Sequence, residues 1–342
     1  MHAIKPIAMK YAYPLCLVIA FSLLIAGCKK DDSANLNKSK PAVIVYKAPA
    51  NFRVVGYLQD WEIQAGQSND FDMTRLNYLN IDFEAMTASG QGLPDFTNLD
   101  ATIAAAHKAK VVVLGTVGAS LDLSFLTAAK RTDFIDSLMA SVGVLHLDGL
   151  DIDLEGDNIN SDYEGFVGDL SVALKAKGKI LTAAVATWER ASFTDKSLTY
   201  FDYVNVMSYD KTGPWDPSDP GPDSPYEMVT YDFNYWSNTR GITPSKINVG
   251  VPFYGYGFGA GVKENYNYVQ IVNQFPGSEN KDHITVAAGG TVYYNGIPTI
   301  QKKTTFAMQN AGGVMIWEIM ADAKGKKSLL NAINETANPD NN

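Results

Sequence analysis

Three carboxylates spaced two residues apart are the feature of this sequence most able to do chemistry: Asp151, Asp153 and Glu155. Side chains of a β-strand alternate between two faces, so in a strand these three acids share one face. The residues between them, at positions 150, 152 and 154, are leucine, isoleucine and leucine and share the other face. If that apolar face packs against helices, the strand directs three acids into the interior of its sheet.

Burying three acids together has consequences for proton transfer. A buried, uncompensated charge costs several kcal/mol, and the motif contains no basic residue, so stability alone does not explain the pattern. Successive acids on one face lie about 7 Å apart, and their repulsion raises the pKa of at least one of them. Glu155 comes last and has the longest side chain. We therefore predict that Glu155 is a general acid whose pKa is tuned by Asp153 and Asp151.

Alternating strand and helix patterns must position these acids. The candidate strands are 54–58, 78–83, 110–117, 149–154, 180–186, 203–208, 247–253 and 313–318, and the candidate helices are 99–109, 131–144, 163–176, 225–239, 299–311 and 324–335. Several of the strands are almost continuous apolar runs, as expected for parallel strands covered on both faces. The pattern predicts one α/β domain over residues 51–337, a (β/α)8 TIM barrel.

The place of the acidic strand in this barrel matters for its function. It is the fourth of eight strands, which disfavours the alternative that its acids are merely solvated at a sheet edge. Active sites of such barrels lie at the C-terminal ends of the strands, where Glu155 stands. A doubly wound open sheet is the alternative fold, but no Gly-rich phosphate-binding loop follows the first strand.

The N-terminus is typical of an exported protein. Residues 1–27 combine two lysines with an apolar run that ends at Cys28, and the run is short for the ~20 residues that span a membrane. This segment resembles a bacterial lipoprotein signal, which implies lipidation of Cys28 and anchoring to the outer membrane. Residues 29–32 (Lys-Lys-Asp-Asp) resemble a surface-export signal, and residues 28–50 are predicted to be a flexible tether. An uncleaved membrane-anchor helix is the alternative.

Composition narrows the class of partner. The net charge of −9 disfavours nucleic acid and suits a neutral polysaccharide. Cys16 lies in the leader, so only Cys28 would remain, and an internal disulfide or a Cys-ligated metal is excluded. The four histidines show no metal-ligand spacing. We expect no metal, no cofactor and a monomeric protein.

The segment from Asp148 to Glu155 resembles the signature of family 18 glycoside hydrolases, the chitinase family. Four further segments resemble the first, sixth, seventh and eighth strands of that family: 56–61, 204–210, 250–255 and 313–318. The resemblance extends over residues 51–335. It implies hydrolysis of β-1,4 linkages in N-acetylglucosamine polymers by a retaining mechanism in which the substrate's own 2-acetamido oxygen is the nucleophile.

The resemblance also implies a role for each site residue. Glu155 would protonate the glycosidic oxygen, Asp153 would orient the acetamido group, and Asp151 would share a proton with Asp153. Tyr209 would hold the acetamido carbonyl oxygen. Met207 and Asp210 would line the same sugar site.

Aromatic side chains can stack on the apolar faces of sugar rings. Trp317 and Trp188 follow strands and are predicted to bind substrate at the mouth, as is Trp61. Tyr57 is predicted to border the catalytic sugar site. Trp236 falls within a predicted helix and is expected in the core.

Two segments depart from the family pattern. The third strand lacks the usual Ser-x-Gly-Gly ending. The segment between Gly255 and Pro298 is short where larger members carry a full α+β insertion. A short or reduced insertion predicts a shallow, open cleft and endo-type cleavage.

Two other functions stay open at this point. An endo-β-N-acetylglucosaminidase that cuts the core of N-linked glycans would use the same residues. An inactive chitin- or glycan-binding protein is disfavoured, because such proteins typically replace the glutamate that is present here at position 155.

Overall fold

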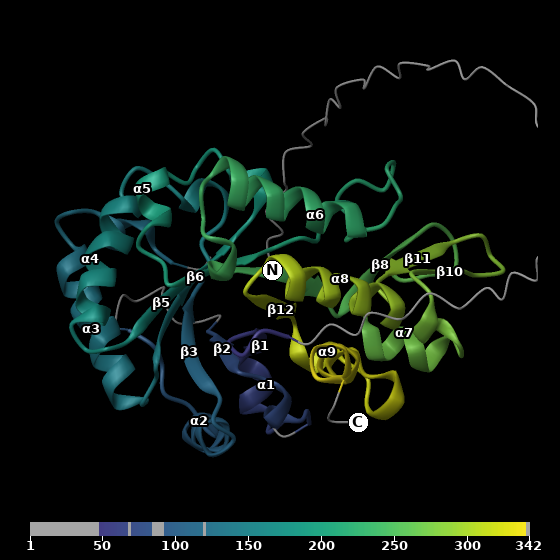
Figure 1. Cartoon of the computed structure of the whole chain (residues 1–342), viewed down its shortest axis with the longest axis horizontal. Coiled ribbons are helices and arrows are strands. Elements are labelled where there is room, and N and C mark those ends of the chain that lie inside the picture. The colour runs from purple at the N-terminus through teal and green to yellow at the C-terminus, as the bar shows by residue number, and fades with distance from the viewer. Residues whose placement is uncertain (1–47, 68–69, 84–91, 119–120, 340–342) are drawn as a thin grey trace, which may run out of the picture. The chain divides into compact units, whose positions relative to one another are not determined.

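Eight parallel strands close into a barrel in the computed structural model, which describes residues 48–67, 70–83, 92–118 and 121–339 (Figure 1). The barrel strands are β1 (Arg53–Gln59), β2 (Tyr78–Asp82), β3 (Val112–Val117), β4 (Gly149–Ile152), β5 (Ile180–Val185), β6 (Tyr203–Val206), β7 (Ile247–Pro252) and β12 (Gly313–Trp317). β12 pairs with β1 and with β7, which closes the ring. The predicted TIM barrel is confirmed, and the open sheet is excluded. The predicted leader, Cys28 and the tether as far as residue 47 lie outside the described residues.

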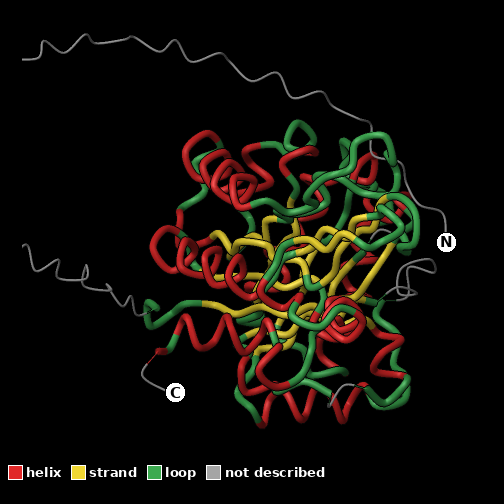
Figure 2. Tube along the Cα trace, turned by 90° about the vertical axis from the view of Figure 1, so that its right-hand side faces the viewer, coloured by secondary structure: helices red, strands yellow, loops and turns green. Residues whose placement is uncertain are grey.

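Helices surround the strands, as the red and yellow layers of Figure 2 show. The helices are α1 (Asp60–Gln64), α2 (Leu99–Lys108), α3 (Arg131–Val144), α4 (Tyr163–Lys175), α5 (Asp195–Leu198), α6 (Tyr226–Asn234), α7 (Tyr268–Gln274), α8 (Ile297–Asn310) and α9 (Leu329–Ala337). A π-helical turn, Tyr235–Thr239, continues α6. In the described part of the chain, none of these helices has the length and apolar character needed to cross a membrane.

Two apolar clusters lie on opposite sides of the strands. The larger one, between strands and helices, contains Leu150, Ile152 and Leu154, so the apolar face of β4 packs outward as predicted. It also contains Trp236, which is fully buried. The smaller cluster lies inside the barrel and includes Tyr209. This division leaves the acidic face of β4 directed inward.

The segment after β7 is short but folded. It forms an antiparallel sheet of β8 (Tyr254–Phe258), β9 (Asn265–Asn267), β10 (His283–Thr285) and β11 (Thr291–Tyr294), together with α7 (Figure 1). The sheet order is β10-β11-β8-β9. The insertion predicted from its length is therefore a small α+β unit, and its first strand starts next to the end of β7.

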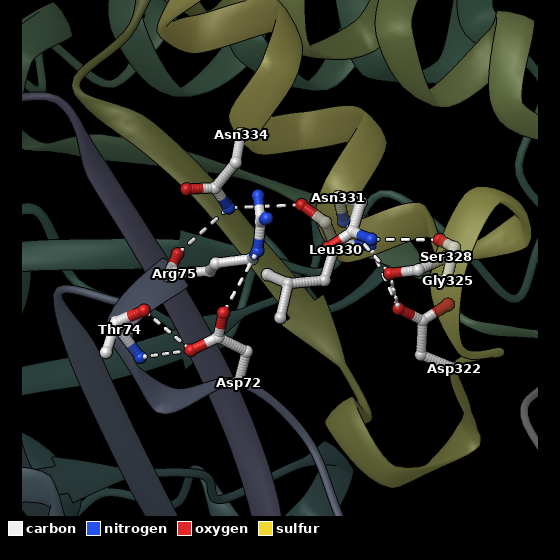
Figure 3. A network of polar contacts seen from close by, with 9 residues as sticks. All are labelled: Asp72, Thr74, Arg75, Asp322, Gly325, Ser328, Leu330, Asn331 and Asn334. Atoms are coloured by element: carbon white, nitrogen blue, oxygen red, sulfur yellow. Dashed lines mark hydrogen bonds and ion pairs between the residues drawn. The ribbon is translucent and has the colours of Figure 1, made fainter. Parts of the chain in front are cut away.

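The C-terminal helix is fixed to the start of the barrel (Figure 3). Asn334 Nδ2 donates to the carbonyl oxygen of Arg75 at 3.0 Å. The α9 helix begins at Leu329, later than predicted, because Ser328 caps it by accepting a hydrogen bond from the backbone N of Asn331. Ala48 N donates to Ala337 O at 3.2 Å, so the chain joins the domain two residues before the predicted end of the tether.

Candidate active site

A pocket lies where the barrel strands end. Its empty space, which includes open solvent, measures about 430 Å³. The pocket is lined by Asp153, Glu155, Trp188, Met207, Tyr209, Asp210 and Trp317. All seven were singled out in the sequence as site residues. They come from the segments after β4, β5 and β6 and from the end of β12.

Extended backbone carries the alternation of β4 beyond its last paired residue. Glu155 has φ −121° and ψ 154°, which are strand values. Asp151 is fully buried, whereas Asp153 and Glu155 are partly exposed to the pocket. The three acids therefore form a series that rises from the barrel interior to its mouth.

The lowest acid, Asp151, is well supplied with hydrogen-bond donors. Tyr57 Oη donates to Asp151 Oδ2 at 2.7 Å, and Thr182 Oγ1 and Asn205 Nδ2 donate to Oδ1. Burial raises the pKa of Asp151 to about 6, while the donors oppose that rise. No hydrogen bond between Asp151 and Asp153 occurs in the described structure, so their sharing of a proton stays a prediction.

The middle acid, Asp153, is the least satisfied. Its Oδ1 is buried and has no hydrogen-bond partner among the residues that the structure describes. Burial, followed by the charges of Glu155, Asp82 and Asp151, raises its pKa well above the ordinary value. The raised pKa favours the protonated form of Asp153, and its partnerless Oδ1 can accept a hydrogen bond from a ligand.

Glu155 is the acid nearest the mouth. Burial and the charge of Asp210 raise its pKa to about 7. A carboxyl with this pKa is protonated in a large fraction of molecules near neutral pH and can give up its proton readily. The predicted general acid thus has the electrostatic environment that its role requires.

The segment after β6 forms the opposite wall. Asp210 has a φ of +60°, which is unusual for a residue with a side chain, although aspartate tolerates it better than most. Its Oδ1 accepts hydrogen bonds from Tyr254 Oη at 2.5 Å and from Tyr256 Oη at 2.8 Å. Tyr209 has a pKa raised well above its ordinary value by burial and by the charge of Asp153, so its hydroxyl stays protonated and able to donate.

Two predicted substrate contacts lie outside the pocket lining. Tyr57 is 1% exposed, and its hydroxyl donates to Asp151, so it supports an acid; its place beside the sugar site stays a prediction. Its ring lies 5.4 Å from that of Trp317, which does line the pocket. Trp61 on α1 is 50% exposed, and its indole nitrogen donates to Gln59 Oε1. Trp61 is thus not among the residues that line the pocket, unlike Trp188 and Trp317.

The sequence analysis missed three residues of the site. Glu189 accepts a hydrogen bond from the backbone N of Gly156, and its pKa is raised to about 8 by burial and by the charge of Glu155. The position of Glu189 just after the end of β5, at the rim where the strands end, was the signal in the sequence that could have identified it. The other two are Tyr254 and Tyr256, whose spacing of two places both rings on the side of β8 that faces Asp210.

The site offers acids without metal-binding geometry. Within the described residues, no group of three or more histidine, cysteine, aspartate or glutamate side chains is arranged to hold a metal ion. The arrangement instead places the carboxyl of Glu155 and a buried, partnerless oxygen of Asp153 together in the lining of one pocket.

Solved structures of chitinases share this fold. The GH18 chitinase ChiB from the chitin utilization locus of Flavobacterium johnsoniae is 31% identical, with a TM-score of 0.76 over 86% of this chain and 94% of that chain. A chitinase from Bacteroides thetaiotaomicron is 28% identical, with a TM-score of 0.72 over 84% of this chain and 96% of that chain.

Curated relatives match over shorter regions. Probable chitinase 10 of Drosophila melanogaster is 29% identical over 189 residues, which is 48% of this chain and 8% of that protein. A probable endochitinase of Caenorhabditis elegans is 33% identical over 157 residues, 39% of this chain and 25% of that protein. This chain thus spans a quarter or less of these two relatives. The model of glycosyl hydrolases family 18 matches residues 53–322, and the chain belongs to that family.

Proposed function

We propose that the protein hydrolyses β-1,4 linkages in N-acetylglucosamine polymers, chitin or chito-oligosaccharides, with Glu155 as the proton donor. One observation carries the proposal: Glu155, with a pKa of about 7, lines a pocket next to Asp153, whose buried Oδ1 has no partner in the described structure. Similarity to the chitinases of Flavobacterium johnsoniae and Bacteroides thetaiotaomicron supports the choice of polymer.

The proposed reaction retains the anomeric configuration and uses the substrate as nucleophile. Asp153 accepts a hydrogen bond from the acetamido N–H and turns the acetamido oxygen toward the anomeric carbon. That oxygen forms a bond to the carbon while the glycosidic bond breaks, and Glu155 transfers its proton to the leaving oxygen. Tyr209 donates to the acetamido oxygen.

Water completes the turnover in the second step. The Glu155 carboxylate accepts a proton from water, whose oxygen bonds to the anomeric carbon and opens the oxazolinium ring. Two successive inversions leave the product with the configuration of the substrate. Trp317 and Trp188 line the pocket and provide apolar ring faces for the sugar.

The experiment is incubation with chitohexaose and, separately, with a high-mannose glycoprotein, with products identified by mass. We expect shorter chito-oligosaccharides from the first substrate and an intact glycan on the second. Glu155→Gln is the matched control, because it keeps the shape of the side chain and removes the proton; it should lower the rate at least about 1,000-fold. Release of the glycan without cleavage of chitohexaose would establish the endo-β-N-acetylglucosaminidase instead.

We also propose that the protein is a lipid-anchored monomer of the outer membrane, as the lipoprotein-like N-terminus indicates. Growth of producing cells with an alkyne-labelled fatty acid should label the protein, and Cys28→Ser should abolish the label. The variant should then appear in the soluble fraction and elute as a monomer in size-exclusion chromatography. Labelling of the Cys28→Ser protein would refute the assignment.

A further inference from the structure

A cation lies at the opposite end of the barrel from the pocket. Arg53 is the first residue of β1, and its guanidinium lies 4.7 Å from the ring centre of Tyr203. Arg53 Nε donates to Asn248 Oδ1 at 2.9 Å, and Nη2 donates to the carbonyl oxygen of Ser245 at 2.6 Å. The proposed reaction assigns no role to this charge.

Strand register places Arg53 level with two buried carboxamides. Arg53 pairs with Gly313 of β12, Gly313 pairs with Asn248 of β7, and Asn248 pairs with Asn205 of β6. Gly313 has no side chain, and a Cβ there would lie 2.7 Å from Asn248 Oδ1. The glycine therefore lets Arg53 reach across β12 to Asn248.

A continuous chain of hydrogen bonds leads from Arg53 to the acidic strand. Asn248 Nδ2 donates to Asn205 Oδ1 at 2.9 Å. Asn205 Nδ2 donates to Tyr57 Oη at 3.1 Å and to Asp151 Oδ1 at 3.4 Å. Tyr57 Oη in turn donates to Asp151 Oδ2 at 2.7 Å.

The chemistry of the guanidinium fixes the direction of this chain. Arginine has only donors, so the Asn248 atom that faces Arg53 must be the carbonyl oxygen. The amide nitrogen of Asn248 then faces Asn205, which must present its oxygen there and its own amide nitrogen to Asp151. Asn205, Asn248 and Asp151 are all fully buried, so a carboxamide turned the other way would lose these bonds without replacement by water.

We propose that Arg53 is a positioning residue that orients Asn248 and Asn205 so that Asp151 remains an ionised hydrogen-bond acceptor. The shared proton of the acidic pair then resides on Asp153, which lines the pocket. The catalytic consequence rests on the proposed function, but the protonation of Asp151 does not.

Other groups also face Asp151 and must be separated from the effect of Arg53. They are Tyr57 from β1, Asp153 just after β4, Tyr163 from α4 and Tyr203 from β6, with Asn80 of β2 and Thr182 of β5 as uncharged neighbours. The three tyrosines have raised pKa values and stay neutral. Among these groups, Asp153 is therefore the acid that could share a proton with Asp151. Tyr203 and Tyr78 face the guanidinium itself.

The test is a titration of the aspartate carboxyl carbons by NMR in protein labelled with ¹³C-aspartate, with the Asp151 signal assigned by Asp151→Asn. Arg53→Gln should raise the pKa of Asp151 by about half to one pH unit, because the carboxamides are free to turn over. Arg53→Lys keeps a cation with only donors and should restore most of the wild-type value. In the hydrolysis assay, the acid limb of kcat should move to higher pH in Arg53→Gln with little change in KM.

Arg240→Gln is the matched control. Arg240 also lies over an aromatic ring, that of Trp236, and donates to backbone carbonyl oxygens, but its chain of contacts does not lead to β4. Its replacement should cost stability and leave the Asp151 titration unchanged. An equal shift in Arg240→Gln would overturn the proposal.

A double-mutant cycle tests whether the effect passes through Asn205. In an Asn205→Leu background, Arg53→Gln should no longer change the Asp151 pKa, and a shift that persists there would also overturn the proposal. If Arg53→Gln does not fold, Asn248→Leu interrupts the same series of hydrogen bonds and should give the same shift in the pKa of Asp151. An unchanged titration of Asp151 in Asn248→Leu would refute the proposal. Absence of hydrolysis in the wild type would defeat the proposed function, while the titration would still decide this inference.

Discussion

Two buried aspartates of this barrel show how differently a fold can treat the same side chain. Asp322, next to α9, accepts hydrogen bonds from Ser328 Oγ and from the backbone N atoms of Ala323, Leu329 and Leu330 (Figure 3 draws those from Ser328 and Leu330). Burial raises its pKa only to about 6 because these donors oppose the rise. Asp153 has an oxygen with no partner in the described structure, and its pKa lies well above the ordinary range.

The difference separates a structural carboxylate from a chemical one. Asp322 is surrounded by donors that belong to the fold, so its ionised form is satisfied and it completes the start of a helix. Asp153 is left incomplete at the pocket, where a ligand can supply the missing donor. An unsatisfied buried polar atom is costly, so its presence beside Glu155 indicates function.

Replacement of Asp153 gives the largest contrast. Asp153→Asn should lower kcat at least about 100-fold, because the side chain can no longer exchange a proton with its neighbours. The free energy of unfolding should match that of the wild type near about pH 3, where the carboxyl is protonated in both the folded and the unfolded state, and should exceed it at about pH 8, where the unfolded state is ionised. Kinetics on chito-oligosaccharides and urea unfolding at both pH values measure this. Full activity of the variant would remove the distinction between the two aspartates.

Replacement of Asp322 should have the opposite profile. Asp322→Ala leaves the backbone N–H groups of Leu329 and Leu330 without their acceptor, which should cost roughly 2 kcal/mol of unfolding free energy. The kcat of the folded variant should equal that of the wild type. Urea unfolding followed by circular dichroism, together with steady-state kinetics, checks both parts. A large loss of kcat in a fully folded variant would contradict the structural assignment.

The raised pKa values of the acids make stability depend on pH in a defined direction. Glu155, Glu189 and Asp322 have pKa values of about 7, 8 and 6 in the folded protein, above those of unfolded chains. The folded state therefore binds more protons than the unfolded state, and the free energy of unfolding should fall as pH rises from 5 to 8, by several kcal/mol. Glu189→Gln should flatten the upper part of this curve. A stability that rises over this range would show that the acids are not held in their protonated forms.

A smaller shift should follow removal of the charge opposite Glu155. The alkaline limb of activity should lie near pH 7, since Glu155 must be protonated. Asp210→Asn removes a negative charge that raises the pKa of Glu155, so the limb should move to lower pH by about half a pH unit. Asp216→Asn, on the same loop, is the control and should leave the limb in place. An alkaline limb at the same pH in the wild type and in Asp210→Asn would show that the charge of Asp210 does not raise the pKa of Glu155.

Local patterns in the sequence determined the barrel and the acidic series. Strand alternation and helical periodicity depend only on neighbours in the chain, so the sequence was enough to predict the eight strands. The same alternation predicted that Asp151, Asp153 and Glu155 point inward and that Leu150 and its apolar partners pack outward. Residues that follow strands at the mouth, such as Trp188 and Trp317, could also be placed, because all C-terminal strand ends meet at one rim.

The partners of these acids were decided only by the closed barrel. Tyr57 reaches Asp151 across 94 positions of the chain, and Tyr254 reaches Asp210 across 44. Strand register and the fold of the insertion bring these pairs together, and neither leaves a local trace in the sequence. For the same reason the sequence could not show that Tyr57 supports an acid while Trp61 lies outside the pocket. Chain-local periodicity specifies which face a residue occupies; the closure of the barrel specifies what it meets there.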